Sequence, residues 1–167
     1  MKQSGIAFVG DKFVPLRRAS IPITDLAVQR GIGLFESLRT YDGKAFALDL
    51  RLQRLLASAK YLGLKVGTSI SAKFIHRVIK LGLKKVKFGE SLIKIVLTGG
   101  DSDGLRVQNF SRLFVIFSPL HLWPEKYYEQ GIKLKTVKFA REFTHLKSLS
   151  YLIPSLADSE AKKSRFE

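Results

Sequence analysis

The sequence Leu34-Phe35-Glu36-Ser37-Leu38-Arg39-Thr40-Tyr41-Asp42-Gly43-Lys44-Ala45-Phe46-Ala47-Leu48 holds the strongest short hairpin signal of the chain. Asp42-Gly43 is a preferred pair for a two-residue hairpin turn, because both positions of that turn need positive φ angles. We predict one strand over residues 34–41 and a second over 44–48. The rest of the domain can be placed around this pair.

The segments on both sides of this hairpin predict further strands and helices. Upstream, Ile6-Ala7-Phe8-Val9 and Lys12-Phe13-Val14-Pro15 flank Gly10-Asp11 and predict another hairpin. Downstream, a helix is expected to start with Asp49 as its cap and to end at Gly63. Its apolar residues recur at helical spacing, and they are Leu52, Leu55, Leu56, Ala59 and Leu62.

The remaining patterns complete a layered domain. A second helix is predicted over residues 71–85 and strands over 92–98 and 113–117, with a glycine-bearing loop at 99–104. Strand pairs that alternate with helices predict a two-layer α+β domain at residues 1–119. Residues 120–167 are expected to form a connector, a strand at 132–139 and a final helix. That segment is too short to close a core of its own.

The net charge is the unusual property of the composition. The chain has 29 Lys and Arg against 14 Asp and Glu, a formal charge of +15, which favours anionic ligands or surfaces. The densest basic run, at residues 80–87, falls at the end of a predicted helix, where cations complement the helix dipole. Aromatic residues do not alternate with these lysines as a base-stacking surface requires, so nucleic acid is disfavoured as a partner.

Further compositional features bound the class of protein. No cysteine is present, which excludes disulfide and thiolate chemistry. The first residues lack the apolar core of a signal peptide, and no apolar run is long enough to span a bilayer. We therefore expect a soluble, cytoplasmic protein without a membrane partner.

The residues by themselves indicate little catalytic chemistry. The three histidines have no metal-ligand spacing, so no metal site is predicted, and neither a nucleophile elbow nor a phosphate loop occurs. Lys147 lies between Leu146 and Leu149. A lysine becomes a nucleophile when desolvation or nearby cations remove its charge. Lys147 can therefore be a reactive amine or an ordinary lysine.

Two blocks of the sequence resemble the fold-type IV (class IV) pyridoxal phosphate-dependent aminotransferases, a family that includes branched-chain and D-amino-acid aminotransferases and aminodeoxychorismate lyase. The first block runs from Asp25 through Gly31-Ile32-Gly33-Leu34-Phe35-Glu36-Ser37-Leu38-Arg39 and Asp42-Gly43 to Arg54-Leu55-Leu56-Ala57-Ser58-Ala59. The second is Leu146-Lys147-Ser148-Leu149-Ser150-Tyr151-Leu152 with Leu156-Ala157 and Glu160-Ala161-Lys162. The resemblance implies the class IV fold, with a two-layer N-terminal domain and an incomplete, barrel-like C-terminal one.

The resemblance also implies roles for individual residues. Lys147 matches the lysine that binds pyridoxal 5′-phosphate covalently and later moves the substrate proton. Arg54 matches the arginine that holds the cofactor phosphate. Tyr151 matches an aromatic position near the cofactor, and Phe35 and Arg39 match strand positions that line the substrate pocket. The family further implies a homodimer.

Three departures from the family pattern bear on function. Arg51 replaces the usual histidine before Arg54. Gly99-Gly100 replace an arginine of the D-amino-acid enzymes, which favours L-amino acids of the branched-chain type and 2-oxo acids. The family continues well past Glu167 and there supplies the acid that keeps the cofactor ring protonated. We therefore expect impaired transamination from a truncated chain, whether a fragment, a shortened gene product or one half of a split enzyme.

Two alternatives to transamination stay open. A lyase of the aminodeoxychorismate type shares the lysine and the phosphate anchor but eliminates pyruvate. A non-catalytic fragment would instead serve for binding through the basic surface, or for dimerisation through a subunit contact.

Overall fold

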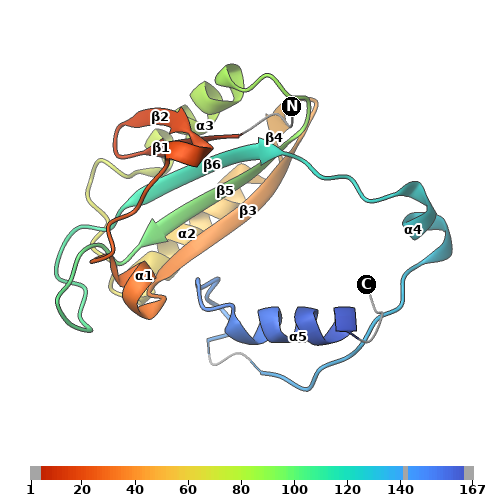
Figure 1. Cartoon of the computed structure of the whole chain (residues 1–167). Coiled ribbons are helices and arrows are strands. Elements are labelled where there is room, and N and C mark those ends of the chain that lie inside the picture. The colour runs from red at the N-terminus through yellow and green to blue at the C-terminus, as the bar shows by residue number, and fades with distance from the viewer. Residues whose placement is uncertain (1–4, 141–142, 164–167) are drawn as a thin grey trace. The chain divides into compact units, whose positions relative to one another are not determined.

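The computed structural model describes residues 5–140 and 143–163 and divides the chain into two units. Unit 1 contains the residues up to Leu120 together with His145–Leu149. Unit 2 contains His121–Thr144 and the residues from Ser150 onward. Figure 1 traces the chain through both units. The short segment around Lys147 therefore belongs to the same unit as the N-terminal strands.

Unit 1 is built on a six-stranded antiparallel sheet with the strand order β2-β1-β6-β5-β3-β4. The strands are β1 (Ile6–Val9), β2 (Lys12–Pro15), β3 (Gly33–Tyr41), β4 (Lys44–Ala45), β5 (Ser91–Thr98) and β6 (Leu113–Pro119). Helices α2 (Leu48–Tyr61) and α3 (Ala72–Lys85) lie on one face of this sheet (Figure 1). The short helices η1 (Leu16–Arg18) and α1 (Leu26–Arg30) precede β3. This arrangement is the predicted two-layer α+β architecture.

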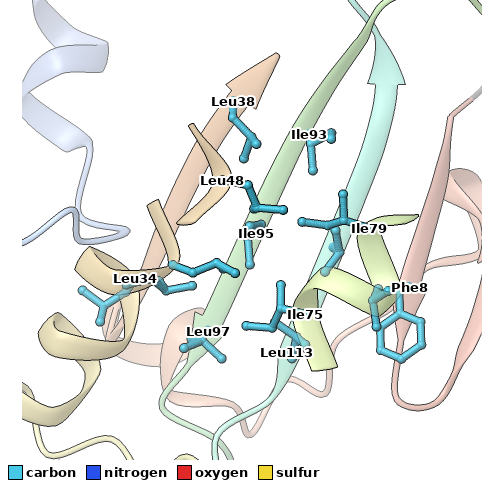
Figure 2. Packing of buried hydrophobic residues seen from close by; sticks show 14 of the residues in the cluster. Phe8, Leu34, Leu38, Leu48, Ile75, Ile79, Ile93, Ile95, Leu97 and Leu113 are labelled. Carbon is cyan, nitrogen blue, oxygen red and sulfur yellow. The ribbon is translucent and has the colours of Figure 1, made fainter. Parts of the chain in front are cut away.

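The core of unit 1 lies between the sheet and the two long helices (Figure 2). Alternate residues of each strand face the helices, because successive side chains of a strand point to opposite sides. Burying each of these side chains contributes about 1.5–3 kcal/mol. The fully buried members from the sheet are Leu34, Ile93, Ile95, Leu97, Val115 and Phe117, and those from the helices are Leu52, Leu55, Ile75 and Ile79.

Both predicted hairpins are confirmed. Asp42 and Gly43 adopt φ angles of 50° and 70° between β3 and β4, and Gly10, at 66°, follows β1 before the chain turns into β2. Glu90 stabilises the turn at Asp42-Gly43. Its carboxylate accepts hydrogen bonds from the Thr40 hydroxyl and, at 2.8 Å, from the backbone N–H of Asp42. The same bonds hold the pKa of Glu90 below its usual value.

The helix predicted to start with Asp49 as its cap starts one residue earlier. Its first residue is Leu48 and its cap is Ala47, which has a φ angle of 52° and makes no side-chain cap bond. Leu48 belongs to the buried core, which favours the earlier start. Asp49 lies in the first turn instead, and its carboxylate is 2.7 Å from Nε2 of His76 on α3.

Two predicted strands differ from the structure. The strand predicted over residues 44–48 is only two residues long, because the chain turns at residues 46–47 to enter α2. The strand predicted over residues 132–139 is absent, and residues 131–140 have no regular structure. A strand needs a neighbour for its backbone hydrogen bonds, whereas the six strands of the sheet all belong to unit 1.

The described residues of unit 2 contain two helices. The sequence patterns do not predict α4 (Glu125–Gln130), whereas the final helix is present as α5 (Leu152–Lys163). Neither helix has a buried residue. Within the residues that the structure describes, no helix combines the length and the apolar character that crossing a bilayer requires.

Helix α3 approaches the sheet closely at Gly82. A Cβ atom at this position would lie between 2.2 and 2.7 Å from three ring atoms of Phe117, which is too short for any contact between side chains. Phe117 is fully buried on β6, so its ring has little room to move aside. The absence of a side chain at Gly82 therefore sets the distance between α3 and the sheet.

We predict that Gly82→Ala lowers the free energy of unfolding by about 1–2 kcal/mol. Overpacking a core costs about 1–3 kcal/mol and outweighs the gain of about 1 kcal/mol in helix propensity. Urea titration measures the difference. Gly89→Ala is the control, because a Cβ there meets nothing within 4 Å. A Gly82→Ala variant as stable as the control would contradict this packing.

Candidate functional site

The segment that carries Lys147 lies along the first half of β3. The backbone N–H of Phe35 donates a hydrogen bond to the carbonyl oxygen of Lys147 at 2.9 Å, and the N–H of Leu149 donates to the carbonyl oxygen of Gly33 at 3.0 Å. An isolated antiparallel bridge lies between these two bonds. The backbone from Lys147 to Leu149 is therefore held to β3.

Side-chain packing supports these backbone bonds. Leu146, just before the lysine, is 4% exposed and belongs to the core of unit 1. A Cβ atom on Gly33 would lie 2.5 Å from Cδ1 of Leu149 and 2.8 Å from the carbonyl oxygen of Leu97. Glycine at position 33 therefore lets the lysine segment and β5 approach β3 from its two edges at once.

The ammonium group of Lys147 lies over an aromatic ring. Its Nζ atom is 4.5 Å from the ring centroid of Phe35, within the range of a cation–π interaction. Phe35 is partly buried on the strand face that points away from α2, and a second cation, Lys94 on β5, lies 5.9 Å from the same ring. The Phe35 ring therefore holds the end of the Lys147 side chain next to the strand that anchors its backbone.

A buried ion pair lies at the next residue of β3. Nε and Nη2 of Arg54 each donate to a different carboxylate oxygen of Glu36, at 2.6 Å. The Glu36 side chain is 1% exposed, and a second guanidinium, that of Arg51, lies 3.7 Å away. These hydrogen bonds to Glu36 raise the pKa of Arg54. The carboxylate thus orients Arg54 and keeps it charged.

Arg54 can also bind an anion from this position. A guanidinium has five N–H donors, and the pair with Glu36 uses two of them. The Arg54 side chain is 45% exposed. Two arginines against one carboxylate leave one net positive charge at the site. A phosphate group matches the planar donor fork of arginine.

Lys147 and Arg54 are anchored to consecutive residues of β3. Phe35 contacts the lysine and Glu36 pairs with the arginine. Because neighbouring residues of a strand point to opposite faces, the two anchors occupy the two sides of one strand. The structure thus places the two predicted cofactor-binding residues against neighbouring positions of β3, on opposite faces of the sheet.

The remaining predicted site residues lie in different surroundings. Arg39 shares the outward face of β3 with Phe35; its Nε donates to the Thr40 carbonyl oxygen at 3.2 Å and its guanidinium lies 4.0 Å from the Tyr41 ring centroid. Tyr151 belongs to unit 2. The roles of Phe35, Arg39 and Tyr151 stay predictions.

The loop after β5 is tied to the start of α1. Asp25 is fully buried and caps α1, and it accepts hydrogen bonds from Thr98 at 2.8 Å and Arg112 at 2.7 Å. Gly100 has a φ angle of 75°, and a Cβ there would lie 2.4 Å from the carbonyl oxygen of Phe110. A bulky side chain at position 100 therefore has no space.

In the described part of the chain, no group of three potential ligand side chains could hold a metal ion.

Glu36, which orients Arg54 at the candidate site, is a residue that the sequence patterns did not single out. It alternates with Leu34 and Leu38, whose side chains are buried, so its carboxylate is predicted to enter the core. A buried carboxylate needs a cationic partner. Arg54 lies in the next predicted helix, between the apolar residues Leu52 and Leu55. That alternation is a sequence signal which could have identified the pair.

Comparison with known proteins assigns this architecture to a family. Residues 33–167, which include the third strand and the lysine segment bound along it, match the model of the amino-transferase class IV family. The chain belongs to this family. A putative branched-chain-amino-acid aminotransferase of Methanocaldococcus jannaschii is 30% identical over 92% of this chain and 54% of its own length.

Another relative has a different activity, and solved structures share the fold. The aminodeoxychorismate lyase of Bacillus subtilis is 27% identical over 71% of this chain and 41% of its own. A branched-chain amino acid aminotransferase solved with pyridoxamine 5′-phosphate has a TM-score of 0.86 at 20% identity over all of this chain and 59% of that one. The branched-chain aminotransferase of Thermoproteus uzoniensis, solved with norvaline, has a TM-score of 0.81 at 21% identity over 98% of this chain and 58% of its own. The chain spans about half the length of the curated relatives that it matches along most of its own length.

We predict that Arg54→Met lowers the free energy of unfolding by about 2 kcal/mol, because it leaves a buried carboxylate without its main partner. The double variant Glu36→Met/Arg54→Met should be more stable than the sum of the two single changes implies, with a coupling energy of about 1–2 kcal/mol. Urea titration of the three variants tests the cycle. Additive losses would show that the pair does not act as a unit.

Proposed function

We propose that this chain carries the cofactor lysine and the phosphate-binding arginine of a pyridoxal 5′-phosphate-dependent aminotransferase. The reaction would transfer an amino group between an L-amino acid of the branched-chain type and a 2-oxo acid. The observation that carries the proposal is the pairing of the Lys147 segment with the first half of β3, the strand whose Glu36 orients Arg54. Class IV membership of the chain supports it.

The residues present fit the chemical needs of this cofactor. Pyridoxal 5′-phosphate supplies an aldehyde for covalent attachment and a ring that accepts electrons from the substrate. Attachment needs a positioned amine, which Lys147 offers above the Phe35 ring. Phosphate binding needs a positioned cation, which Arg54 offers through its unused donors, with Arg51 beside it.

Each residue then has a distinct task. Glu36 orients the Arg54 fork for the phosphate. The two backbone bonds to β3 hold the Lys147 main chain still, so its side chain alone moves when Nζ takes a proton from the substrate carbon and returns it. The Phe35 ring excludes water from one side of Nζ. General acid–base catalysis of this kind contributes about 10²–10⁴-fold to a rate.

The preference for L-substrates rests on the loop after β5. Gly99 and Gly100 occupy the position where D-amino-acid enzymes of the family are expected to have an arginine. Side chains are sterically excluded there, since a Cβ on Gly99 would lie 2.9 Å from Cβ of Leu26 and one on Gly100 would contact the Phe110 backbone. Phe35 and Arg39 would line the substrate side of β3.

The proposal assigns functions to residues of this chain and does not require turnover by the 167 residues alone, because the relatives are nearly twice as long. A homodimer and a domain division at residues 1–119 and 120–167, with residues 145–149 returning to the first domain, belong to the same proposal.

A lyase is the second candidate. The match to the Bacillus subtilis aminodeoxychorismate lyase favours it, and the lysine and phosphate anchor would serve both reactions. Product analysis separates the two, because a lyase releases pyruvate whereas a transaminase produces an amino acid and a 2-oxo acid in equal amounts.

We predict that pyridoxal 5′-phosphate forms a covalent adduct with Lys147. Borohydride reduction followed by peptide mass spectrometry should locate the label on that residue, and Lys147→Ala should abolish it. Lys94→Ala is the control, because Lys94 also approaches the Phe35 ring but lies on β5, outside the lysine segment. In this variant Lys147 should be labelled as fully as in the parent protein. A label distributed over surface lysines would contradict the proposal.

We further predict that Arg54→Lys weakens cofactor binding by about 10- to 100-fold, the loss expected for a charged hydrogen bond of about 1.5–3 kcal/mol. The affinity for pyridoxal without phosphate should not change. Absorbance titration with both compounds measures the difference. An equal loss for both would mean that Arg54 acts on the fold and not on the phosphate.

A further inference from the structure

The outer face of α3 carries a continuous row of cations. Lys73, Arg77, Lys80 and Lys84 recur at spacings of four, three and four residues. This spacing places them within about 60° of one another around the helix and along about 16 Å of its length. All four are exposed. The buried residues of α3 lie on the opposite face, and they are Ile75, Val78, Ile79 and Gly82.

The helix dipole does not account for this row. Cations complement the C-terminal end of a helix, which explains Lys84, but Lys73 lies in the first turn, where no acidic residue occurs. Like charges three or four residues apart on a helix repel each other, and α3 contains no Asp or Glu. The row therefore persists against local electrostatics.

Neighbouring elements do not neutralise the row. None of the ion pairs in the described residues involves its four members. The carboxylate of Asp49, on α2, pairs with His76 instead. Arg77 lies 5.2 Å from the ring centroid of Phe74, which leaves its charge uncompensated. Four aligned cations with no ion-pair partner among the described residues form a surface whose charge is complementary to an external polyanion.

We propose that this row of α3 cations is a docking surface for the phosphodiester backbone of double-stranded nucleic acid. A duplex presents a rigid, regular array of negative charges, about one per 1.7 Å of its axis. Backbone contacts alone bind it without sequence preference. The sequence-based expectation against nucleic acid rested on the missing aromatic stacking surface, which single strands need and a duplex does not, so the proposal revises that expectation for duplexes. The surface lies on the helix layer of unit 1, whereas the Phe35 ring that contacts Lys147 lies on the outward face of the sheet. Docking is therefore separate from the proposed role of Lys147, and its four cations differ from Arg54 and Arg51, the arginines of the proposed phosphate site on α2.

The structure argues against the two other polyanions. A membrane-surface helix inserts its apolar face into the lipid boundary, but the apolar face of α3 is buried in the core, and Leu81 is the exposed large apolar residue of this helix. Single-stranded nucleic acid binds through bases stacked on aromatic rings, and the row contains none. A duplex needs neither feature.

Fluorescence anisotropy with labelled RNA and DNA duplexes tests the proposal. Four phosphate contacts predict a slope of log K against log salt of about −3 to −4, a loss of roughly a hundredfold between about 50 and 200 mM salt. The triple variant Lys73→Gln/Lys80→Gln/Lys84→Gln should reduce the slope to about −1 and weaken binding at low salt at least tenfold.

The control removes the same charge elsewhere. Arg17, Arg18 and Arg106 are exposed and lie outside α3, so Arg17→Gln/Arg18→Gln/Arg106→Gln lowers the net charge equally and should leave duplex binding within about twofold of the parent. Melting curves by circular dichroism confirm that both variants fold. Equal losses in the two variants, no binding at low salt, or a stronger α3-dependent retention on phosphatidylserine vesicles than on duplexes would overturn the proposal.

Discussion

The backbone hydrogen bonds of β3 are the constraint on which the structure depends. Backbone donors and acceptors in a core must be satisfied, and β3 pairs with β5 from Gly33 to Arg39 along one edge. Its other edge is divided between two partners, since β4 pairs with the end of the strand and the Lys147 segment pairs with its beginning. The backbone of Lys147 is thus held by the same kind of bond that holds the sheet together, which gives it a fixed position relative to the core.

Buried acids organise the charged residues around this strand. Glu36 and Asp25 are both fully buried, and each accepts hydrogen bonds from an arginine that remains partly exposed, Arg54 and Arg112 respectively. Removing a charge from water is costly unless it is paired and hydrogen-bonded, so these carboxylates specify where the two guanidinium groups lie. In Arg54 this leaves a cation that is both oriented and accessible, as a phosphate anchor requires. The cations of α3 have no such partners, and for this reason they suit an external ligand.

The sequence predicted much of the fold, and its errors have local causes. The hairpin at Asp42-Gly43 is encoded in two residues that tolerate positive φ angles, and the stripes of α2 and α3 follow from helical spacing alone. The prediction of a strand over residues 132–139 was wrong, because an alternating pattern forms a strand only where a partner strand is available. For the candidate site, resemblance to the family pointed to Lys147 and Arg54. The alternation of Glu36 with Leu34 and Leu38 indicates a buried carboxylate, but only the structure shows that Arg54 is its partner.

The sequence by itself determined the class of the N-terminal domain and the order of its strands and two long helices, because turns and apolar periodicity depend on neighbours within a few positions. The cofactor roles of Lys147 and Arg54 rest on the family resemblance and stay predictions. Only the tertiary structure decided that residues 145–149 return to the N-terminal unit, that Phe35 and Glu36 present Lys147 and Arg54 on the two sides of one strand, and that Gly82 sets the distance of α3 from Phe117. These contacts join residues far apart in the chain. They depend on which surfaces pack together when the sheet forms, and a pattern of neighbouring residues does not specify that packing.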